Sequence, residues 1–272
     1  MASNFNWSLP FLANTEQAKS DRKTALIILN QPFSVPLLRQ LWHACKWRCC
    51  ADGGANRLHD ALISDAKKVV GQSEDVRERY IPNLIKGDLD SLRQDVREYY
   101  SSQKVDIVQD HDQDSTDLMK CIASLSEIER QEGGDQYDII ILGGLSGRLD
   151  QTIHTLSYLH KLRKKRKRVF AVNDENVAWV LDEGEHHISV DHDAFGPTCG
   201  LLPVGIDSTK LTTRGLRWNL TDCDSHFDGM VSTSNHLVPS EGIVYVKTTK
   251  PIWWTMELRS YERNLRECKQ AS

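Results

Sequence analysis

The chain has 272 residues, of which 39% are hydrophobic and 26% are charged, a composition typical of a soluble globular protein with enough apolar residues for a core. This composition excludes disordered, collagen-like and coiled-coil proteins, and no apolar run approaches the roughly 20 residues that a membrane-spanning helix needs. The formal net charge of -4 gives no overall attraction for nucleic acids, so such a role would depend on the basic run at 163–168.

The first half of the chain alternates short apolar runs with segments of helical period, which is typical of βα units in a mainly parallel sheet. We predict strands at 25–29, 47–51, 81–86, 105–108 and 137–142. Ser91, with Gln94 three residues later, predicts a capped helix start after the third strand. The other predicted helices have apolar faces formed by Leu58, Ala61 and Leu62; by Leu118, Cys121, Ile122, Leu125 and Ile128; and by Leu149, Ile153, Leu156, Leu159 and Leu162.

The pattern changes after about residue 175, where no long helical period remains. Short runs such as 243–246 and 252–256 indicate strands, and clusters of Gly, Pro, Asp and Ser separate them, as in an antiparallel sandwich or barrel. The run at 169–172 could end the first sheet or begin the second domain. We therefore expect an N-terminal arm at 1–23, an α/β domain at 24–175 and an all-β domain at 176–272.

Aspartates follow four of the predicted strands, at the points where helices begin. They are Asp52, Asp88, Asp90, Asp114, Asp117 and Asp150. The carboxyl ends of parallel strands meet at one edge of a sheet, so we expect these side chains to lie near one another. A single Asp at a helix start can be only a cap, but several acids at one edge repel each other unless a cation or a proton compensates. Oxygen ligands without His or Cys favour Mg²⁺ over a transition metal.

Glycines accompany these acids at 53–54, 87, 143–144 and 147. A glycine lets the backbone approach a ligand, and the amides of a helix start can hold phosphate oxygens, although each glycine can equally form a tight turn. Neither the P-loop pattern nor the dinucleotide-binding GxGxxG pattern occurs. We therefore predict a metal and polyphosphate site of another kind, with Arg148 and glycine amides facing the phosphates.

An ordered series of motifs resembles the thiamin pyrophosphokinase family. The motifs are DGGAN at 52–56, GDLDS at 87–91, QDSTD at 113–117, GGLSGRLDQ at 143–151, and GLRWNL at 215–220 with STSN at 232–235. The resemblance implies an α/β catalytic domain followed by an antiparallel β-sandwich, in a homodimer whose active sites lie between subunits. The implied reaction moves the pyrophosphoryl group of ATP to the hydroxyl of thiamin by Mg²⁺-assisted in-line attack and releases AMP.

The resemblance also implies roles for individual residues. Mg²⁺ would be held by Asp88, Asp90 and Asp117, with Asp150 as a fourth catalytic residue. The nucleotide and its phosphates would be surrounded by Asp52, Gly53, Gly54, Asp114, Thr116 and Arg148. Thiamin would be held by Gln113, Trp218, Ser234 and Asn235. The indole of Trp218 also suits this role on physical grounds, because it can stack on a cationic ring. Asp117 or Asp150 could accept the proton of the hydroxyl, if a base is needed.

Two other functions remain open from the sequence. An ordinary phosphoryl kinase or a nucleotide hydrolase could use the same acidic edge, and would release ADP rather than AMP. A non-catalytic nucleotide or nucleic-acid binding protein could use the basic run at 163–168, although a solvated helix end also explains this run.

The seven cysteines form no CxxC pair, and a chain of this length does not need disulfides for stability. We therefore expect reduced thiols and a cytoplasmic location. His43, Cys45 and Cys49 match no common zinc site, so we expect ordinary burial for them. The N-terminus has no basic flank before an apolar segment, which predicts that it is not a signal peptide.

Overall fold

The computed structural model describes residues 3–13, 22–66 and 75–259. Its contacts divide the chain into two compact units. The α/β unit is Asp21–Arg148, and the β unit is Met1–Ser20 with Leu149–Ser272. By these contacts residues 149–175 fall in the β unit, and the domain boundary expected at residue 175 stays a prediction. Residues 1–2 and 14–21 of the expected N-terminal arm lie outside the described residues.

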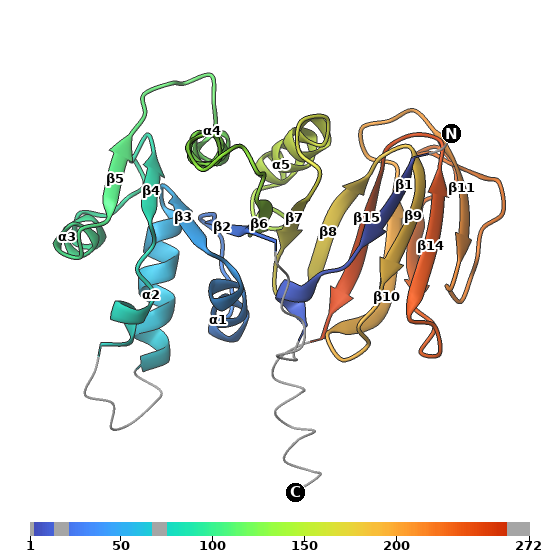
Figure 1. The fold of residues 1–272 in the computed structure, drawn as a ribbon, viewed down its shortest axis with the longest axis horizontal. Helices are drawn as coiled ribbons and strands as arrows, with labels where there is room; N and C mark the ends of the chain where they lie inside the picture. The colour runs from blue at the N-terminus through green and yellow to red at the C-terminus, as the bar shows by residue number, and fades with distance from the viewer. Residues whose placement is uncertain (1–2, 14–21, 67–74, 260–272) are drawn as a thin grey trace, which may run out of the picture. The chain divides into compact units, whose positions relative to one another are not determined.

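Within the described residues, the α/β unit has five parallel strands in the order β6-β2-β3-β4-β5 (Figure 1). Their bounds are β2 (Thr24–Ile28), β3 (Trp47–Ala51), β4 (Leu84–Gly87), β5 (Asp106–Gln109) and β6 (Asp138–Leu142). Every residue of β2 and β6 is buried, which explains the uninterrupted apolar runs at 25–28 and 139–142. The predicted parallel sheet is confirmed. The third strand begins later than the predicted Ile81, because Pro82 has no N–H to donate to a strand ladder.

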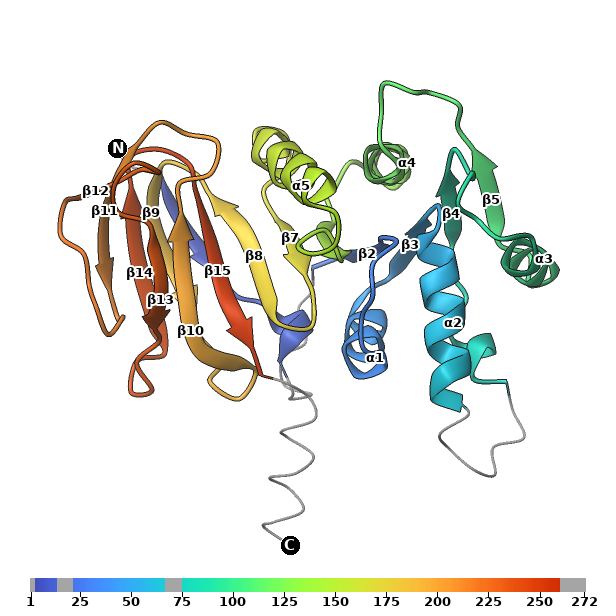
Figure 2. The same cartoon turned by 180° about the vertical axis from the view of Figure 1, so that it is seen from behind.

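Helices cover both faces of this sheet. They are α1 (Val35–Ala44), α2 (Gly54–Ala66), α3 (Gln94–Ser102) and α4 (Asp117–Gln131), with a short 3₁₀ helix η3 (Val76–Arg79) before β4. The strands β2 to β5 step in one direction across the sheet, so right-handed crossovers put α1, α2 and α3 on one face. The chain then returns to β6 through α4, which lies on the opposite face (Figures 1 and 2).

The start of α3 differs from the prediction. The helix begins at Gln94 with Arg93 in the cap position, and no side chain of the described residues makes a capping hydrogen bond to it. Ser91 instead donates from its hydroxyl to Asp90 and from its backbone N–H to Asp52. The predicted capping box is therefore wrong, because the polar groups of Ser91 bind the acidic edge of the sheet.

The β unit is a sandwich of two sheets within the described residues. One sheet includes the strands β13-β10-β15-β8-β7, and the other has the order β1-β9-β14-β11-β12 (Figure 2). The described pairs in these sheets are antiparallel, apart from β1 with β9. The bounds are β1 (Asn4–Trp7), β7 (Val169–Val172), β8 (Asn176–Leu181), β9 (Gly184–Ser189), β10 (Phe195–Leu202), β11 (Thr209–Arg214), β12 (Cys223–Ser225), β13 (Ser232–His236), β14 (Ile243–Thr248) and β15 (Ile252–Leu258), with a 3₁₀ helix η1 (Pro10–Leu12) after β1. The predicted antiparallel sandwich is confirmed.

Aromatic side chains fill the space between the two sheets. Trp7 of β1 lies against Trp179 of β8 and Phe170 of β7, with ring centroids 5.6 and 6.2 Å apart. Trp253 and Trp254 are neighbours on β15 whose side chains point to opposite faces of the strand, and both are at most 1% exposed, so both faces of this strand are covered. Part of the expected N-terminal arm thus forms an edge strand of the sandwich.

The helix α5 (Leu149–Leu162) of the β unit has a mixed surface. Leu159 and Leu162 are buried, whereas Leu149 is 74% and Ile153 is 52% exposed. The continuous apolar face predicted for this helix is therefore buried only in its second half. The first half presents two exposed apolar side chains four residues apart.

The basic run 163–168 after α5 is only partly exposed: the side chains of Lys164, Lys165 and Lys167 are exposed, whereas its arginines are covered to different degrees. Arg166 and Arg168 are buried. Arg163 pairs at 3.3 Å with a carboxylate of the turn between β8 and β9. Arg168 donates to the carbonyl oxygen of Ser8, just after β1. Burial of Arg166 and Arg168 reduces the number of cations that a nucleic acid could contact, so this arrangement does not favour the nucleic-acid hypothesis.

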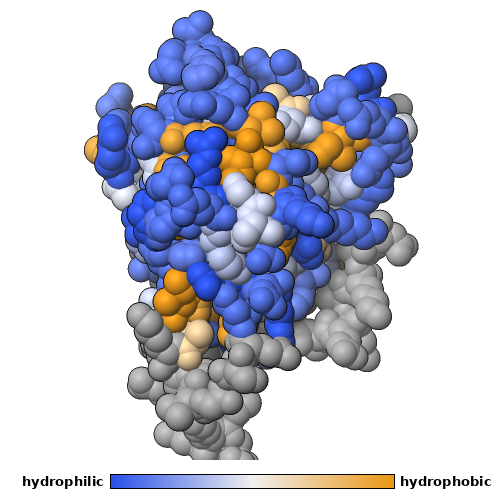
Figure 3. Space-filling model, turned by 90° about the vertical axis from the view of Figure 1, so that its left-hand side faces the viewer, coloured by the Kyte–Doolittle hydropathy of each residue, from blue (hydrophilic) through white to orange (hydrophobic). Residues whose placement is uncertain are grey.

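The surface near β5, an edge strand of the α/β unit, is largely polar. Figure 3 shows this side of the molecule, on which hydrophilic residues predominate and apolar residues form separate small areas. Val108 of β5 is a large apolar side chain with 41% exposure. In the part of the chain that the structure describes, no helix is both long enough and apolar enough to span a bilayer.

Candidate active site

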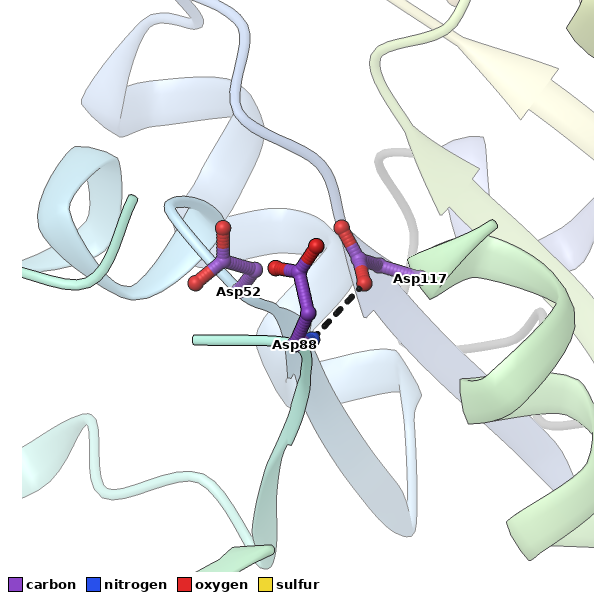
Figure 4. Close-up of side chains that lie close together, drawn as sticks. All are labelled: Asp52, Asp88 and Asp117. Carbon is purple, nitrogen blue, oxygen red and sulfur yellow. Dashed lines mark hydrogen bonds between the residues drawn. The ribbon is translucent and has the colours of Figure 1, made fainter. Parts of the chain in front are cut away.

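Among the described residues, three aspartates meet at the carboxyl end of the parallel sheet. Asp52 follows β3, Asp88 follows β4, and Asp117 begins α4. Each offers one carboxylate oxygen, and these oxygens all lie within 4.8 Å of one another (Figure 4). We call these three residues the acidic cluster. Its position is the one expected from the parallel topology, in which strand ends converge at one edge.

Asp52 is deeply buried, with 4% exposure. Its backbone has a φ of 42°, in the left-handed region, at the turn between β3 and α2. Oδ2 accepts the backbone N–H of Ser91 at 3.2 Å, whereas Oδ1 is buried without a hydrogen-bond partner among the described residues. Burial raises the pKa of this carboxyl, and hydrogen bonds from Ser91 oppose the shift. A buried carboxylate oxygen without a partner is costly unless a cation binds it, so Asp52 fits the role of a metal ligand.

Asp117 is linked directly to the backbone of Asp88. Its Oδ1 accepts the Asp88 N–H at 3.2 Å (Figure 4). Burial, followed by the charges of Asp88 and Asp52, raises the pKa of Asp117. Gly87 allows this close approach, since a Cβ there would lie 2.7 Å from Cβ of Asp52 and 2.8 Å from Oδ1 of Asp117. The absence of a side chain at residue 87 is therefore needed to pack the acidic cluster.

A buried ammonium lies beside the acidic cluster. Lys120, one turn along α4, is 4% exposed, and its Nζ lies 3.8 Å from Oδ1 of Asp117. The same Nζ donates to the carbonyl oxygen of Asp110 at 2.8 Å, and so ties the start of the loop 110–116 to α4. One ammonium does not balance three carboxylates, so the cluster as described favours a divalent cation.

Asp90 lies on the same loop as Asp88 but outside the acidic cluster. Its side chain is exposed, and its Oδ1 accepts the hydroxyl of Ser91 at 2.9 Å. The family resemblance implied that Asp90 binds the metal and that Asp52 adjoins the nucleotide, whereas the structure groups Asp52 with Asp88 and Asp117. The grouping of Asp52 with Asp88 could have been predicted from their positions in the chain. Each comes directly after a strand, and neighbouring parallel strands bring such residues level with each other. A metal role for Asp90 stays a prediction.

The glycine-rich loop after β6 is held by a residue that the sequence analysis missed. Gly143, Gly144 and Gly147 have φ values of 106°, 85° and 86°, which favour glycine. Oε1 of Gln31 accepts the N–H of Gly144 at 2.8 Å and the hydroxyl of Ser146 at 3.0 Å. Gln31 comes shortly after β2, the neighbour of β6, so the same strand-end argument could have identified it.

Gly53 and Gly54 pack against the end of β2. A Cβ on Gly54 would lie 2.2 Å from the carbonyl oxygen of Ile28, and one on Gly53 would lie 2.4 Å from the side chain of Asn30. Gly54 is therefore needed for the start of α2 to approach the backbone of β2 closely, whereas the contact at Gly53 involves the movable end of the Asn30 side chain. Their contact with a nucleotide stays a prediction.

Gln113, Asp114 and Thr116 lie on the loop between β5 and α4. Gln113 and Asp114 are exposed. Thr116 occupies the cap position of α4, yet its Oγ1 makes no capping bond and is buried without a partner among the described residues. A cap threonine usually binds a backbone N–H of the first turn, so this hydroxyl is available to a ligand.

Arg148 and Asp150 lie on either side of the division between the units. Arg148 ends the α/β unit, and Asp150 stands in the first turn of α5. Both side chains are exposed. An acid in the first turn also interacts favourably with the helix dipole, so Asp150 has a structural role besides the predicted catalytic one.

The residues predicted to bind thiamin in the β unit lie together. Trp218 is 51% exposed. The side chain of buried Asn235 accepts the backbone N–H of Trp218 at 3.2 Å and donates to the carbonyl oxygen of Trp218 at 2.8 Å. This amide therefore fixes the tryptophan backbone. Arg217 and His236 lie near the indole, 4.8 and 5.2 Å from the ring centroid. Ser234 is exposed and has a φ of 55°, a conformation uncommon outside glycine.

Comparison with known proteins gives matches over most of the chain. The model of the thiamin pyrophosphokinase catalytic domain matches residues 38–171, and the model of the thiamin pyrophosphokinase vitamin B1 binding domain matches residues 185–253. Thiamine pyrophosphokinase 3 of Oryza sativa subsp. japonica is 38% identical over 87% of this chain and 88% of its own length. Thiamine pyrophosphokinase 1 of Arabidopsis thaliana is 36% identical over 93% of this chain and 92% of its own. The crystal structure of yeast thiamin pyrophosphokinase has a TM-score of 0.79 at 27% identity, covering 94% of this chain and 91% of that one.

Proposed function

The chain belongs to the thiamin pyrophosphokinase family, and we propose that the acidic cluster is the metal-binding part of its active site. The enzyme transfers the pyrophosphoryl group of ATP to the hydroxyl of thiamin, and forms thiamin diphosphate and AMP. The observation that carries the proposal is the convergence of three carboxylate oxygens within 4.8 Å at the end of the parallel sheet.

The donor set of the acidic cluster fits Mg²⁺. Carboxylate oxygens are hard ligands, and Oδ1 of Asp52, which has no hydrogen-bond partner among the described residues, could coordinate the ion. Asp52, Asp88 and Asp117 would hold the ion, which when bound would neutralise phosphate charge and make phosphorus more electrophilic. Asp90 remains a proposed additional ligand, because its N–H donates to Oδ1 of Asp88 at 3.3 Å and keeps the two acids on one turn.

The phosphate and nucleotide contacts are proposed on the surrounding loops. Backbone amides of the loop 143–147, the hydroxyl of Thr116 and the guanidinium of Arg148 would hold phosphate oxygens. Gly53, Gly54 and Asp114 would adjoin the nucleotide. The thiamin hydroxyl loses its proton as it attacks phosphorus, and Asp117 and Asp150 are the candidate acceptors.

Thiamin is proposed to bind at the exposed indole of Trp218. The indole can stack on an aromatic or cationic ring, and the two hydrogen bonds between the Asn235 amide and the Trp218 backbone fix the backbone that carries it. Ser234, next to Asn235, would add a hydroxyl, and Gln113 would add an amide.

We also propose that the enzyme is a homodimer with active sites at the subunit interface. The exposed Leu149 and Ile153 support this proposal, because apolar side chains four residues apart on a helix form a continuous contact surface.

A cytoplasmic location is proposed from the cysteines. Six cysteines are free thiols in the described part of the chain, and five of these are buried. Free thiols in this number are typical of a reducing compartment. Cys268 lies outside the described residues.

The experiment that tests the proposed site and reaction is product analysis with ATP, Mg²⁺ and thiamin, resolving AMP from ADP and thiamin diphosphate from monophosphate. We expect AMP and thiamin diphosphate in equal amounts, and loss of both when EDTA removes the metal. ADP with thiamin monophosphate would contradict pyrophosphoryl transfer. Turnover that persists in EDTA would contradict the metal role of the acidic cluster.

A further inference from the structure

The loop that carries Asp88 has a backbone conformation that must be held by its surroundings. This loop, residues 88–93, connects β4 to α3. Leu89, directly after Asp88, has a φ of 63°, in a region unfavourable for a residue with a side chain. Such conformations persist only where the surrounding structure holds them in place. The near end of the loop continues directly from β4, whereas its far end must be fixed by contacts with another element.

One face at the start of α2 makes the contacts with the far end of the loop. Asp52, Asn56 and Asp60 are spaced four residues apart, which places the two helical members, Asn56 and Asp60, one above the other. Nδ2 of Asn56 donates to the carbonyl oxygen of Ser91 at 2.7 Å, and its Oδ1 accepts the backbone N–H of Arg93 at 3.1 Å. The guanidinium of Arg93 donates to both carboxylate oxygens of Asp60 at 2.7 Å.

Asn56 is suited to this contact by its chemistry. The side chain must donate to one backbone group and accept from another two residues away, and a carboxamide carries a donor and an acceptor on one planar group. Aspartate of the same size has no donor, and leucine has neither group. Asn56 belongs to the DGGAN motif, and neither the motif nor the proposed mechanism assigns it a role.

We propose that Asn56 is a positioning residue that fixes the loop 88–93, and thereby the Asp88 carboxylate, for metal binding. It acts through the backbone of Ser91 and Arg93. The inference rests on the proposed metal role of the acidic cluster. Residues that orient metal ligands typically change metal affinity by about 10- to 100-fold when they are replaced.

The test measures metal affinity directly. Mn²⁺ binding is followed by electron paramagnetic resonance, with an ATP analogue present that has a methylene group in place of the α,β-bridging oxygen. The variants are Asn56→Ala, Asn56→Asp and Asp88→Asn. The matched control is Asp65→Asn, which removes a carboxylate of the same helix that pairs with Arg39 instead of the loop.

We expect Asn56→Ala to weaken Mn²⁺ binding about 10- to 100-fold and to lower kcat, with thiamin KM within twofold of the wild type. Asn56→Asp keeps the acceptor for the Arg93 N–H, so it should retain more Mn²⁺ affinity than Asn56→Ala. It also tests the proposal if the alanine variant does not fold. Asp65→Asn should bind Mn²⁺ like the wild type.

Three results would overturn the inference, and they are distinguishable. If both Asn56 variants bind Mn²⁺ like the wild type while Asp88→Asn does not, the positioning role is wrong and the metal site stands. If Asp65→Asn weakens binding as much as Asn56→Ala, the effect is a general loosening of α2. If the wild type binds Mn²⁺ no better than Asp88→Asn, the metal role of the cluster fails, and the inference fails with it.

Discussion

The three carboxylates of the acidic cluster have different surroundings. Asp52 is enclosed at the start of α2, Asp117 adjoins the buried ammonium of Lys120, and Asp88 lies half-buried on a loop. Folding therefore depends least on the side chain of Asp88, since loop positions contribute little core packing. This difference makes Asp88 the best residue for separating catalysis from stability.

We expect Asp88→Asn to lower kcat at least about 1000-fold while the fold is retained, because the amide removes a negative charge from the metal site but keeps an acceptor for the Asp90 N–H. Steady-state kinetics at saturating Mg²⁺ and thermal unfolding followed by circular dichroism would check both parts. A variant that is unfolded at room temperature would show that Asp88 is instead a structural residue.

Trp218→Ala should raise thiamin KM by about 2- to 30-fold, which corresponds to the loss of one stacking contact. The ATP KM should not change, because the indole is assigned to thiamin alone. Phe227→Ala is the matched control, since it removes another exposed aromatic ring of the β unit. An increase in ATP KM with normal thiamin KM would contradict the stacking role.

At the scale of elements, β1 is joined to the sandwich through a buried histidine of β9. Nδ1 of His186 accepts the indole N–H of Trp7 at 3.0 Å, and the opposite ring nitrogen lies 2.8 Å from the carbonyl oxygen of Asp182. Burial lowers the pKa of His186 to about 4, partly offset by Asp182. The folded protein therefore requires the neutral imidazole, since a protonated Nδ1 would point a second N–H at Trp7.

This histidine predicts a pH dependence of stability. In the unfolded chain His186 takes up a proton near pH 6.5, but in the folded protein only near pH 4, so acidification between these values favours unfolding. The free energy of unfolding should fall by roughly 3 kcal/mol over this range from His186 alone. Urea unfolding at several pH values would measure it. His186→Gln, which can make both hydrogen bonds, should remove that part of the slope, and an unchanged slope would contradict the assignment.

At the scale of the whole molecule, the exposed half of α5 leads to a prediction about assembly. Replacing both Leu149 and Ile153 by Lys should convert a dimer to a monomer and reduce activity, because charges in an apolar interface are costly to desolvate. Light scattering after size-exclusion chromatography would measure the mass. Phe227→Lys changes an exposed apolar residue elsewhere and should leave the dimer intact. A wild-type monomer, or a double variant that stays dimeric, would contradict this interface.

Local patterns predicted the fold class because they depend on neighbours in the chain. The uninterrupted apolar runs of β2 and β6 and the helical period of α4 reflect burial of whole elements. The same patterns were less reliable for α5, whose apolar residues are buried only in part. Periodicity shows which side of a helix is apolar, but not which other element covers it.

The sequence by itself determined the two-part fold and the edge of the sheet at which the acids gather, because the order of strands and helices dictates a parallel sheet and its strand ends. Only the tertiary structure decided which acids meet: Asp52 joined Asp88 and Asp117, while Asp90 turned toward Ser91. It also revealed the contacts of Lys120, Gln31 and Asn56. Membership of a site depends on distances of a few ångströms, and these are set by packing between segments far apart in the chain.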